Sequence, residues 1–419
     1  MDKIVIQGGK PLQGKVEIGG AKNAVLPIMA ATLLAEGVFH IENVPDLRDV
    51  KTMAHLLRII GARVEFENHT LTIDTHHCNF FEAPYELVKT MRASIYVLGP
   101  LLAKFSQARV SLPGGCAIGS RPVDLHVKGL QMLGADITLE RGYIVARARK
   151  LTGANINFDI SSVGATGNVL MAAALAEGKT VLDNASREPE VSALAEFLVK
   201  MGASIEGIGT SRLTIDGGKR LQPADYHVIP DRIETGTFMI AAAITAGEVE
   251  LTGTDPALVA SLVAKLGEIG VRVELGQSTI HCQSPEKVQA ANITTSPFPG
   301  FATDLQAQWM ALMSVAEGSS VLTETIFFDR FMHVAELNRL GAQIEMNENV
   351  AVVKGVERLV GAPVMSTDLR ASASLILAGL QAEGQTEVLR VYHLDRGYER
   401  IEKKLQALGA QIWREAGGL

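Results

Sequence analysis

A unit of about seventy residues recurs six times along the chain, and this repeat limits the possible folds more than any other feature. Each copy contains a glycine that is followed by Ala or Val and a short β-type run. The intervals between successive glycines are 73, 68, 68, 71 and 68 residues, so six copies of one supersecondary unit fill the chain. The glycines are Gly61, Gly134, Gly202, Gly270, Gly341 and Gly409.

Each copy contains two helices of different character. The helix before the marker glycine is amphipathic, as over residues 49–60, and the glycine ends it. The helix further upstream is apolar nearly all round and belongs in an interior; it ends in a second stop such as Ala35-Glu36-Gly37. In the second copy, Val97-Leu98-Gly99-Pro100 interrupts this inner helix. β-type segments such as residues 38–41 join the two helices.

An apolar helix in every copy predicts an α/β protein with its helices inside and its sheets outside. In ordinary βαβ arrays the helices cover a parallel sheet, and that arrangement would expose one apolar helix in each copy. Six α/β units with buried helices also do not suggest a solenoid.

Composition argues against several classes of protein. The 419 residues are 47% hydrophobic and 20% charged, which fits a globular chain of two or three domains. A net charge of −7 argues against a broad nucleic-acid-binding face, and the longest apolar run, residues 24–35, is too short to span a bilayer. The first six residues lack the apolar core of a signal peptide, and three cysteines cannot all pair. We therefore expect a cytoplasmic protein. Three adjacent residues, His76-His77-Cys78, do not easily converge on one metal ion.

Charged residues collect at the predicted helix starts of successive copies. An Arg there is unfavourable beside the helix dipole by roughly 0.3 to 1 kcal/mol, unless an anion lies between the guanidinium and the free N–H groups. Matching positions in matching copies favour a phosphate or carboxylate site over solvated loop charges. Asp304 and Asp368 in the same layer suggest proton transfer or hydroxyl recognition. The predicted starts are Lys22, Arg92, Val163, Arg232, Asp304 and Arg370 for inner helices, and Asp46, Arg121, Arg187, Asp255, Arg330 and Arg396 for outer helices.

The second copy carries a glycine-rich loop with one thiol, over residues 113–125. Glycines at 114, 115 and 119 give this loop conformational freedom. Arg121 and the start of the next helix both favour the thiolate of Cys116, so Cys116 has the surroundings of a reactive cysteine. The alternative from the loop alone is a surface loop with an incidental cysteine.

Six segments together carry a resemblance to a known family: residues 20–24, 87–94, 113–125, 230–236, 367–372 and 395–400. They resemble the UDP-N-acetylglucosamine 1-carboxyvinyltransferase family of enolpyruvyl transferases. The resemblance covers essentially the whole chain, and the Cys loop separates it from the EPSP synthases of the same superfamily.

The resemblance implies a two-domain inside-out α/β barrel with three repeats in each domain. It implies an N-terminal domain over residues 22–229, a C-terminal domain over residues 1–21 plus 230–419, and an active site in the cleft between them. The reaction implied is transfer of enolpyruvyl from phosphoenolpyruvate to the 3′-hydroxyl of UDP-N-acetylglucosamine, with release of phosphate by addition and elimination. This is the first committed step of peptidoglycan synthesis.

The resemblance also assigns roles to residues of this chain. Cys116 is the implied general acid and the site of a covalent adduct, Asp304 the candidate base, and Lys22 and Arg396 further catalytic residues. The residues implied to bind phosphoenolpyruvate are Lys22, Asn23, Arg92, Arg121, Arg330, Arg370 and Arg396. Those implied to bind the UDP-sugar are Asn23, Arg92, Arg121, Pro122, Val123, Asp124, Leu125, Ser162, Val163, Gly164, Asp304 and Ile326. Asp368 and Arg232 are implied to support the site.

No cofactor, metal, nucleic-acid partner or membrane is implied, and the enzyme is expected to work as a monomer and to be a target of fosfomycin. Ile160 departs from the family, whose best-known members have a Lys there, so any contact made by that Lys side chain is in doubt. Two alternatives remain: a transferase acting on shikimate 3-phosphate, and a non-catalytic protein that binds UDP-sugars.

Overall fold

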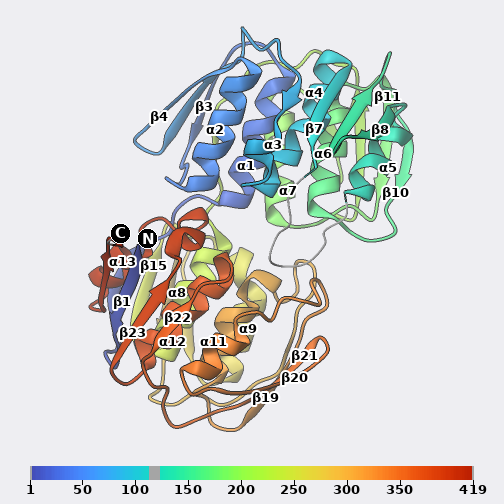
Figure 1. The fold of residues 1–419 in the computed structure, drawn as a ribbon. Helices are drawn as coiled ribbons and strands as arrows, with labels where there is room; N and C mark the ends of the chain where they lie inside the picture. Colours follow the sequence, from blue (N-terminus) through green and yellow to red (C-terminus); the bar gives the residue numbers. More distant parts are fainter. Residues whose placement is uncertain (1, 113–122, 418–419) are drawn as a thin grey trace. The chain divides into compact units, whose positions relative to one another are not determined.

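The computed structural model describes residues 2–112 and 123–417, which form two compact units. The described residues up to Gly19 and from Pro230 onward form one, here called the terminal unit. The described residues from Gly20 to Ile229 form the other, the central unit. Figure 1 shows the course of the chain within each unit.

Each repeat has an inner helix, a strand and an outer helix in that order, and the described residues form six four-stranded sheets. In the third repeat, the sheet order is β10-β11-β13-β12, with β10 parallel to β11 and the other pairs antiparallel. The elements of this repeat are β10 (Asn155–Asn157), α6 (Val163–Leu175), β11 (Gly178–Asp183), α7 (Pro189–Lys200), β12 (Ser204–Glu206) and β13 (Arg212–Gly217).

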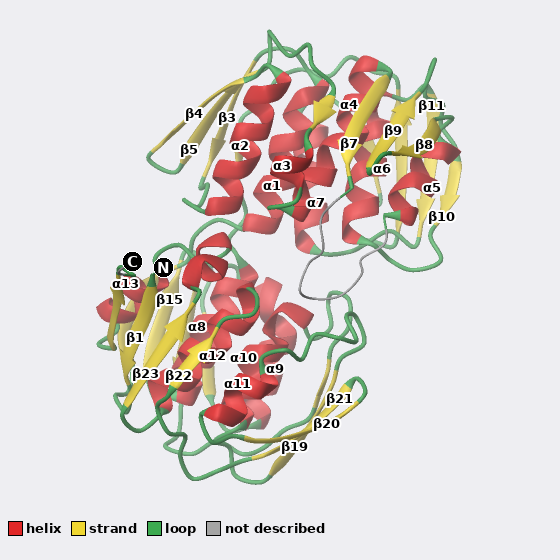
Figure 2. Ribbon diagram, viewed as in Figure 1, coloured by secondary structure: helices red, strands yellow, loops and turns green. Residues whose placement is uncertain are grey.

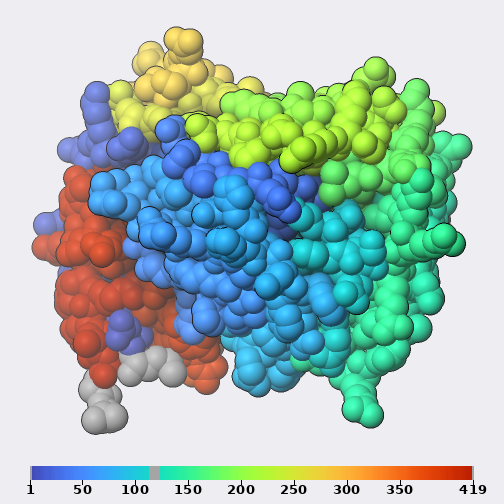
Figure 3. All heavy atoms as spheres, turned by 90° about the horizontal axis from the view of Figure 1, so that it is seen from above, coloured from blue at the N-terminus to red at the C-terminus, as the bar shows by residue number. Residues whose placement is uncertain are grey.

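The rest of the central unit follows the same order. The first repeat contains α1 (Lys22–Ala31), η1 (Thr32–Leu34), β3 (Val38–Glu42), α2 (Arg48–Ile60), β4 (Arg63–Glu67) and β5 (Thr70–Asp74). The second contains β6 (Glu82–Ala83), α3 (Tyr85–Val88), η2 (Arg92–Val97), α4 (Leu98–Phe105), β7 (Gln107–Ser111), α5 (Asp124–Met132), β8 (Asp136–Glu140) and β9 (Tyr143–Arg147). Figure 3 shows these repeats following one another across one face, from blue through cyan to green.

The terminal unit contains the other three repeats. The fourth has α8 (Arg232–Ile244), β15 (Glu248–Thr252), η3 (Pro256–Val259), α9 (Ala260–Glu268), β16 (Arg272–Leu275) and β17 (Thr279–Gln283). The fifth has β18 (Ile293–Thr294), η4 (Thr303–Leu305), α10 (Gln306–Met313), β19 (Ser319–Thr323), α11 (Val334–Arg339), β20 (Gln343–Asn347) and β21 (Val350–Lys354). The sixth has β22 (Pro363–Met365), α12 (Leu369–Gln381), β23 (Gln385–Leu389), η5 (Val391–Arg396), α13 (Ile401–Ala407) and β24 (Gln411–Glu415).

Three strands pair outside the repeat that comes next after them in the sequence. β1 (Lys3–Gln7) lies between β23 and β24, antiparallel to both, and so completes the hairpin of the sixth repeat. β2 (Gln13–Glu17) precedes α1 in the chain but pairs with β15. β14 (Tyr226–His227) precedes α8 but pairs with β3. The first and fourth repeats therefore exchange their edge strands: β2 joins a sheet of the terminal unit and β14 joins a sheet of the central unit.

The two linkers that follow these exchanged strands run side by side. The backbone N–H of Ala21 donates to the carbonyl of Ile229 at 2.8 Å, and the N–H of Asp231 donates to the carbonyl of Gly19 at 2.9 Å. Each linker is thus held by backbone hydrogen bonds to the other.

The inner helices are buried and the sheets are amphipathic, as the sequence predicts. Every residue of α8 from Ile233 to Ile244 is buried, and α8, α10 and α12 pack against one another. The strands alternate, as in β3, where only Phe39 and Ile41 are buried. Figure 2 shows the helices of each unit gathered inside with strands around them, so the inside-out α/β arrangement is confirmed.

The helix stops are also confirmed, but some helix starts are not. The six marker glycines have φ between 93° and 113°, a region that favours glycine. In the second repeat the inner helix starts as a 3₁₀-helix at Arg92 and becomes α-helical at Leu98. Arg330 and Arg396 do not start outer helices, because α11 and α13 are short and begin at Val334 and Ile401. Among the described residues, the helices are too short or too polar to cross a membrane.

Candidate active site

A carboxylate between two buried arginines forms a charged cluster in the terminal unit. Asp304 lies in η4, just before α10. Its Oδ1 accepts from Arg330 Nη1 at 2.7 Å, and its Oδ2 accepts from Arg370 Nη2 at 2.8 Å. The two guanidinium side chains are only 7% and 5% exposed, whereas a quarter of the Asp304 side chain is exposed. The cluster therefore carries a net positive charge at the start of an inner helix.

The charges of this cluster fix the protonation state of the carboxylate. Burial alone would raise the pKa of Asp304, but the two guanidinium groups of Arg370 and Arg330 outweigh it and hold this pKa well below its ordinary value of 3.8. Asp304 is accordingly ionised throughout the neutral range, and it is a weak base while both arginines are bound to it.

Arg370 is held in place by the start of its own helix and by an aromatic ring. The Asp368 carboxylate is the N-cap of α12, since its Oδ1 accepts from the N–H groups of Arg370 and Ala371 at 2.7 and 3.1 Å. The Arg370 guanidinium carbon lies 5.5 Å from the centroid of the buried Tyr398 ring. Asp368, which the sequence suggests for proton transfer, is engaged as a helix cap.

A buried polar network lies beneath Asp304. Gln308 Nε2 donates to the carbonyl oxygen of Asp304 at 3.0 Å and lies 3.1 Å from both Tyr398 Oη and Thr237 Oγ1. Tyr398 and Thr237 are themselves hydrogen-bonded at 2.8 Å. These contacts tie η4 to the inner helices α8 and α10.

The remaining candidates of the terminal unit lie on neighbouring segments. Ile326 is half-buried in the segment after β19, and its N–H donates to Glu324 at 2.8 Å. Arg396 ends η5 and is half-buried. Arg232 starts α8, with its guanidinium carbon 5.7 Å from the ring of Phe298.

In the central unit, an ion pair marks the start of the first inner helix. Lys22 is the first residue of α1, and its Nζ lies 3.4 Å from Oδ2 of the buried Asp49. Asn23 follows Lys22 and is half-buried. The described side chains provide no cap for α1, so its N-terminal N–H groups add to the positive charge of Lys22. This helix start suits an anion.

The start of α6 is pressed against a buried histidine. A Cβ on Gly164 would lie 2.9 Å from Cε1 of His126, so only glycine fits there without movement. The amide Nδ2 of Asn168 donates a hydrogen bond to Nδ1 of His126 at 2.9 Å. Burial and the positive charge of Arg92 lower the pKa of His126 to about 4, so its ring is neutral at pH 7. Ser162 caps α6 by accepting from the N–H of Ala165 at 3.3 Å.

The other described residues of interest in this unit differ in exposure. Asp124 and Val163 are exposed at the starts of α5 and α6, whereas Val123 and Leu125 are half-buried. Ile160 is 71% exposed, an apolar side chain at a position with room for a polar one. Cys116, Arg121 and Pro122 lie outside the described residues.

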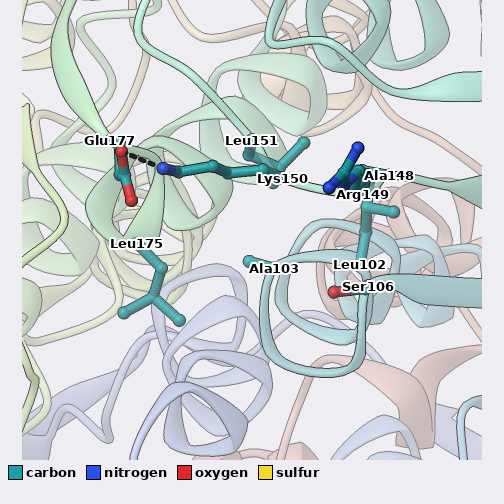
Figure 4. Close-up of a pocket in the computed structure, with 9 residues that line it drawn as sticks. All are labelled: Leu102, Ala103, Ser106, Ala148, Arg149, Lys150, Leu151, Leu175 and Glu177. Carbon is teal, nitrogen blue, oxygen red and sulfur yellow. Dashed lines mark ion pairs between the residues drawn. The ribbon is translucent and has the colours of Figure 1, made fainter.

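A surface pocket of about 190 Å³ in the central unit lies apart from these residues (Figure 4). It adjoins the C-terminal ends of α4 and α6, where partial negative charge attracts cations such as Arg149 and Lys150. Lys150 is also paired with Glu177, as the dashed line in Figure 4 marks. The described lining contains none of the candidate site residues: it consists of Leu102, Ala103, Ser106, Ala148, Arg149, Lys150, Leu151, Leu175 and Glu177.

Comparison with known proteins places the chain in a family. The family model of EPSP synthase (3-phosphoshikimate 1-carboxyvinyltransferase) matches residues 6–405. A protein of Trichlorobacter lovleyi named UDP-N-acetylglucosamine 1-carboxyvinyltransferase is 57% identical over 415 residues, which are 99% of each chain. A protein of Myxococcus xanthus with the same name is 57% identical over 418 residues, covering 99% of this chain and 100% of the relative. The chain belongs to the UDP-N-acetylglucosamine 1-carboxyvinyltransferase family.

Solved structures of enolpyruvyl transferases share the fold of this chain. The enolpyruvyl transferase NikO from Streptomyces tendae has a TM-score of 0.90 at 27% identity and is matched over 99% of its chain and 100% of this one. EPSP synthase from Acinetobacter baumannii has a TM-score of 0.76 at 20% identity, over 99% of this chain and 100% of that one, and shows the shared fold.

For this member of the UDP-N-acetylglucosamine 1-carboxyvinyltransferase family, sequence reasoning missed several polar residues that hold the candidates. Asp49 pairs with Lys22, and His126 abuts Gly164. Glu324 and Tyr398 contact the segments around the arginines of the terminal unit. His126 directly follows the segment Val123 to Leu125, which was a usable signal; the others are buried polar residues whose partners are distant in sequence.

Proposed function

We propose that this protein transfers the enolpyruvyl group of phosphoenolpyruvate to the 3′-hydroxyl of UDP-N-acetylglucosamine and releases phosphate. The observation that supports it most is the Asp304 carboxylate between two buried guanidinium groups, in a chain 57% identical over 415 residues to a relative named for this reaction. Phosphoenolpyruvate carries a carboxylate and a phosphate, which are the groups that arginine binds in bidentate geometry.

The chemistry proceeds by addition and elimination. A proton is added to the methylene carbon of phosphoenolpyruvate, and the sugar 3′-oxygen, losing its proton, forms a bond to the adjacent carbon. The resulting tetrahedral ketal then loses phosphate together with a proton from the new methyl group, which leaves the enolpyruvyl ether. Fixed cations stabilise the phosphate as it leaves. We assign the first proton to Cys116. We assign the phosphoenolpyruvate contacts to Lys22, Arg121 and Arg396, with Arg92, Arg330 and Arg370 supporting the charge.

Asp304 is the proposed base for the 3′-hydroxyl, and its surroundings suggest when it acts. With both arginines bound, the pKa of Asp304 is too low for effective proton removal. An anionic substrate that competes for Arg330 and Arg370 would weaken their hold on the carboxylate and make it more basic. Phosphoenolpyruvate binding and activation of the base are therefore coupled in this proposal.

We also propose contacts for the UDP-sugar and a setting for the reaction. The nucleotide-sugar contacts Asn23, Arg92, Val163, Ile326 and the segment of residues 121–125. Backbone contacts near Ile160 are kept, although this chain has no Lys side chain there. Both substrates are soluble metabolites, so we place the enzyme in the cytoplasm. We propose that it works there as a monomer and serves cell wall synthesis. Fosfomycin would add covalently to Cys116.

The deciding experiment is phosphate release from phosphoenolpyruvate, measured with UDP-N-acetylglucosamine, with shikimate 3-phosphate and with neither. The expected result is phosphate release with UDP-N-acetylglucosamine, and none with shikimate 3-phosphate or with neither acceptor. Release with shikimate 3-phosphate alone would favour the EPSP synthase reaction, and nucleotide-sugar binding without release would favour a non-catalytic protein.

Two variants test the acid. Cys116→Asp should keep much of the turnover because a carboxylic acid still donates a proton, whereas Cys116→Ser should lose most of it. Full turnover by the Ser variant would remove Cys116 from the proton transfer.

A further inference from the structure

A fully buried carboxylate, Glu324, follows β19 and accepts hydrogen bonds from three segments of the terminal unit. Its Oε1 accepts from Thr295 Oγ1 at 2.8 Å and from the N–H groups of Ile326 and Phe327 at 2.8 and 3.0 Å. Its Oε2 accepts from Thr303 Oγ1 at 2.8 Å. All four donors are uncharged, and burial of a carboxylate on such donors is costly unless every bond is kept.

The first connection from Glu324 to the candidate site runs through Thr303. A hydroxyl has one proton, and Thr303 gives it to Glu324, so the oxygen presents a lone pair to other donors. Arg330 Nη1 donates to this oxygen at 3.0 Å and to Asp304 Oδ1 at 2.7 Å. The two protons of Nη1 are thereby both directed, one to Thr303 and one to Asp304.

The second connection runs through Phe327. Its N–H is fixed by Glu324, and its carbonyl oxygen accepts from the N–H of Arg330 at 3.0 Å. The ring of Phe327 lies with its centroid 5.6 Å from the guanidinium carbon of Arg330. One carboxylate thus fixes both the backbone that carries Arg330 and the hydroxyl that orients its guanidinium.

We propose that Glu324 is a positioning residue that holds Arg330 in the orientation in which it binds Asp304, and that it also fixes the segment of Ile326. The kinetic part of this inference rests on the proposed enolpyruvyl transfer. When an anionic substrate competes with Asp304 for Arg330, the bonds to Thr303 and Phe327 keep the guanidinium directed into the site, so that it can pass from the carboxylate to the substrate without turning away.

Replacing Glu324 with Gln separates the two connections. The Gln oxygen still accepts from the N–H groups of Ile326 and Phe327, but the Gln amide then faces Thr303 and donates to it. The Thr303 proton must turn toward other groups, and Arg330 offers only donors. We expect Glu324→Gln to lower kcat about tenfold and to change the KM for UDP-N-acetylglucosamine less than about threefold. Glu324→Ala should lower kcat and also raise this KM, because the segment of Ile326 is released.

Glu402→Gln is the matched control. Glu402 is a buried glutamate in the sixth repeat of the same unit, where it pairs with Arg414 at 3.3 Å. The Glu402→Gln variant should keep kcat within about twofold of the unchanged protein, whatever its effect on melting temperature. A kcat for Glu324→Gln within twofold of the unchanged protein would overturn the proposal.

A second pair of variants covers the case in which Glu324→Gln does not fold. Thr303→Val removes the hydroxyl at nearly constant shape, whereas Thr303→Ser keeps it. The Val variant should lose about tenfold in kcat, and the Ser variant clearly less. Equal losses in the two variants would contradict the connection through Thr303.

A measurement without catalysis separates this inference from the proposed function. Amide hydrogen exchange, followed by mass spectrometry on a peptide spanning Glu324 to Arg330, should be at least about tenfold faster in Glu324→Ala and near the unchanged rate in Glu324→Gln. This result would support the positioning role even if phosphate release failed in the unchanged protein. Unchanged exchange in Glu324→Ala would overturn it.

Discussion

Replacing Asp304 with alanine should lower the unfolding free energy of the terminal unit by about 3 kcal/mol. The substitution leaves two guanidinium groups, 7% and 5% exposed, without their shared carboxylate. Removing one partner of a buried ion pair costs roughly 3–5 kcal/mol, and the quarter exposure of Asp304 lets water replace part of the loss, so the lower end applies. For a unit of this size that corresponds to a melting temperature lower by roughly 6–12 °C.

The dependence on pH follows from the lowered pKa of Asp304. Its stabilising contribution is complete above the ordinary pKa of 3.8 and is lost as the pH falls through the lower pKa of the folded state. The difference between Asp304→Ala and the unchanged protein should therefore be constant from pH 8 to pH 5. It should shrink only below about pH 4.

Thermal melting with and without inorganic phosphate is the assay. Phosphate at a hundred times its dissociation constant for the variant should stabilise Asp304→Ala by about 2.7 kcal/mol, because the freed arginines bind it, and should stabilise the unchanged protein by less. Glu383→Ala is the control: it breaks an exposed pair of the same unit, to Arg358 at 2.8 Å, and should shift melting by less than about 2 °C. An Asp304→Ala shift no larger than this control, or no extra effect of phosphate, would refute the reasoning.

Three further predictions concern packing, titration and thiol chemistry. A Cβ on Gly20 would lie 1.7 Å from the carbonyl oxygen of Asn43, so Gly20→Ala should lower the unfolding free energy in urea by about 1–3 kcal/mol. A Cβ on Gly267 in α9 would meet open space within 4 Å outside its own helix, so Gly267→Ala should raise this free energy by about 0.5–1 kcal/mol. Burial lowers the pKa of His126 from 6.5 to about 4, so the unfolding free energy should fall as the pH drops from 6.5 toward 4. Over the same range His126→Gln should show a smaller fall in melting temperature, and an equal fall would contradict the burial of a neutral ring. Burial raises the pKa of Cys78 to about 11 and that of Cys282 to about 12, so iodoacetamide at pH 7.5 should label neither in the native protein, and peptide mapping should place a fosfomycin adduct at Cys116 alone.

The repeats and the inner helices were predictable because their signals are local. A glycine stop, an all-round apolar helix and an alternating strand can each be recognised within about fifteen residues. The exchange of β2 and β14 could not be predicted this way. β14 has only two residues, Tyr226 and His227, and its partner β3 lies more than 180 residues earlier in the chain.

The candidate site shows the same limit. Comparison of the helix starts of different repeats pointed to both Asp304 and Arg370. In the structure Oδ2 of Asp304 lies 2.8 Å from Nη2 of Arg370. The comparison could not distinguish a reacting acid from a helix cap, as Asp368 shows, because both are acidic residues beside a helix start. It also passed over Glu324, which looks like an ordinary polar strand end in Thr323-Glu324-Thr325 until its buried partners are known.

The position of β1 has a consequence for how the chain folds during synthesis. β1 lies between β23 and β24, so residues 3–7 find their last partners at residues 411–415, about 400 residues later. At 5–20 residues per second, the first strand waits roughly 20–80 s for that partner to be made. The central unit, which needs no residue beyond Ile229, can fold during this time. Meanwhile β1 must be kept from pairing with the exposed edges of other sheets. The residues of this chain that are synthesised last therefore determine when its first strand joins a sheet.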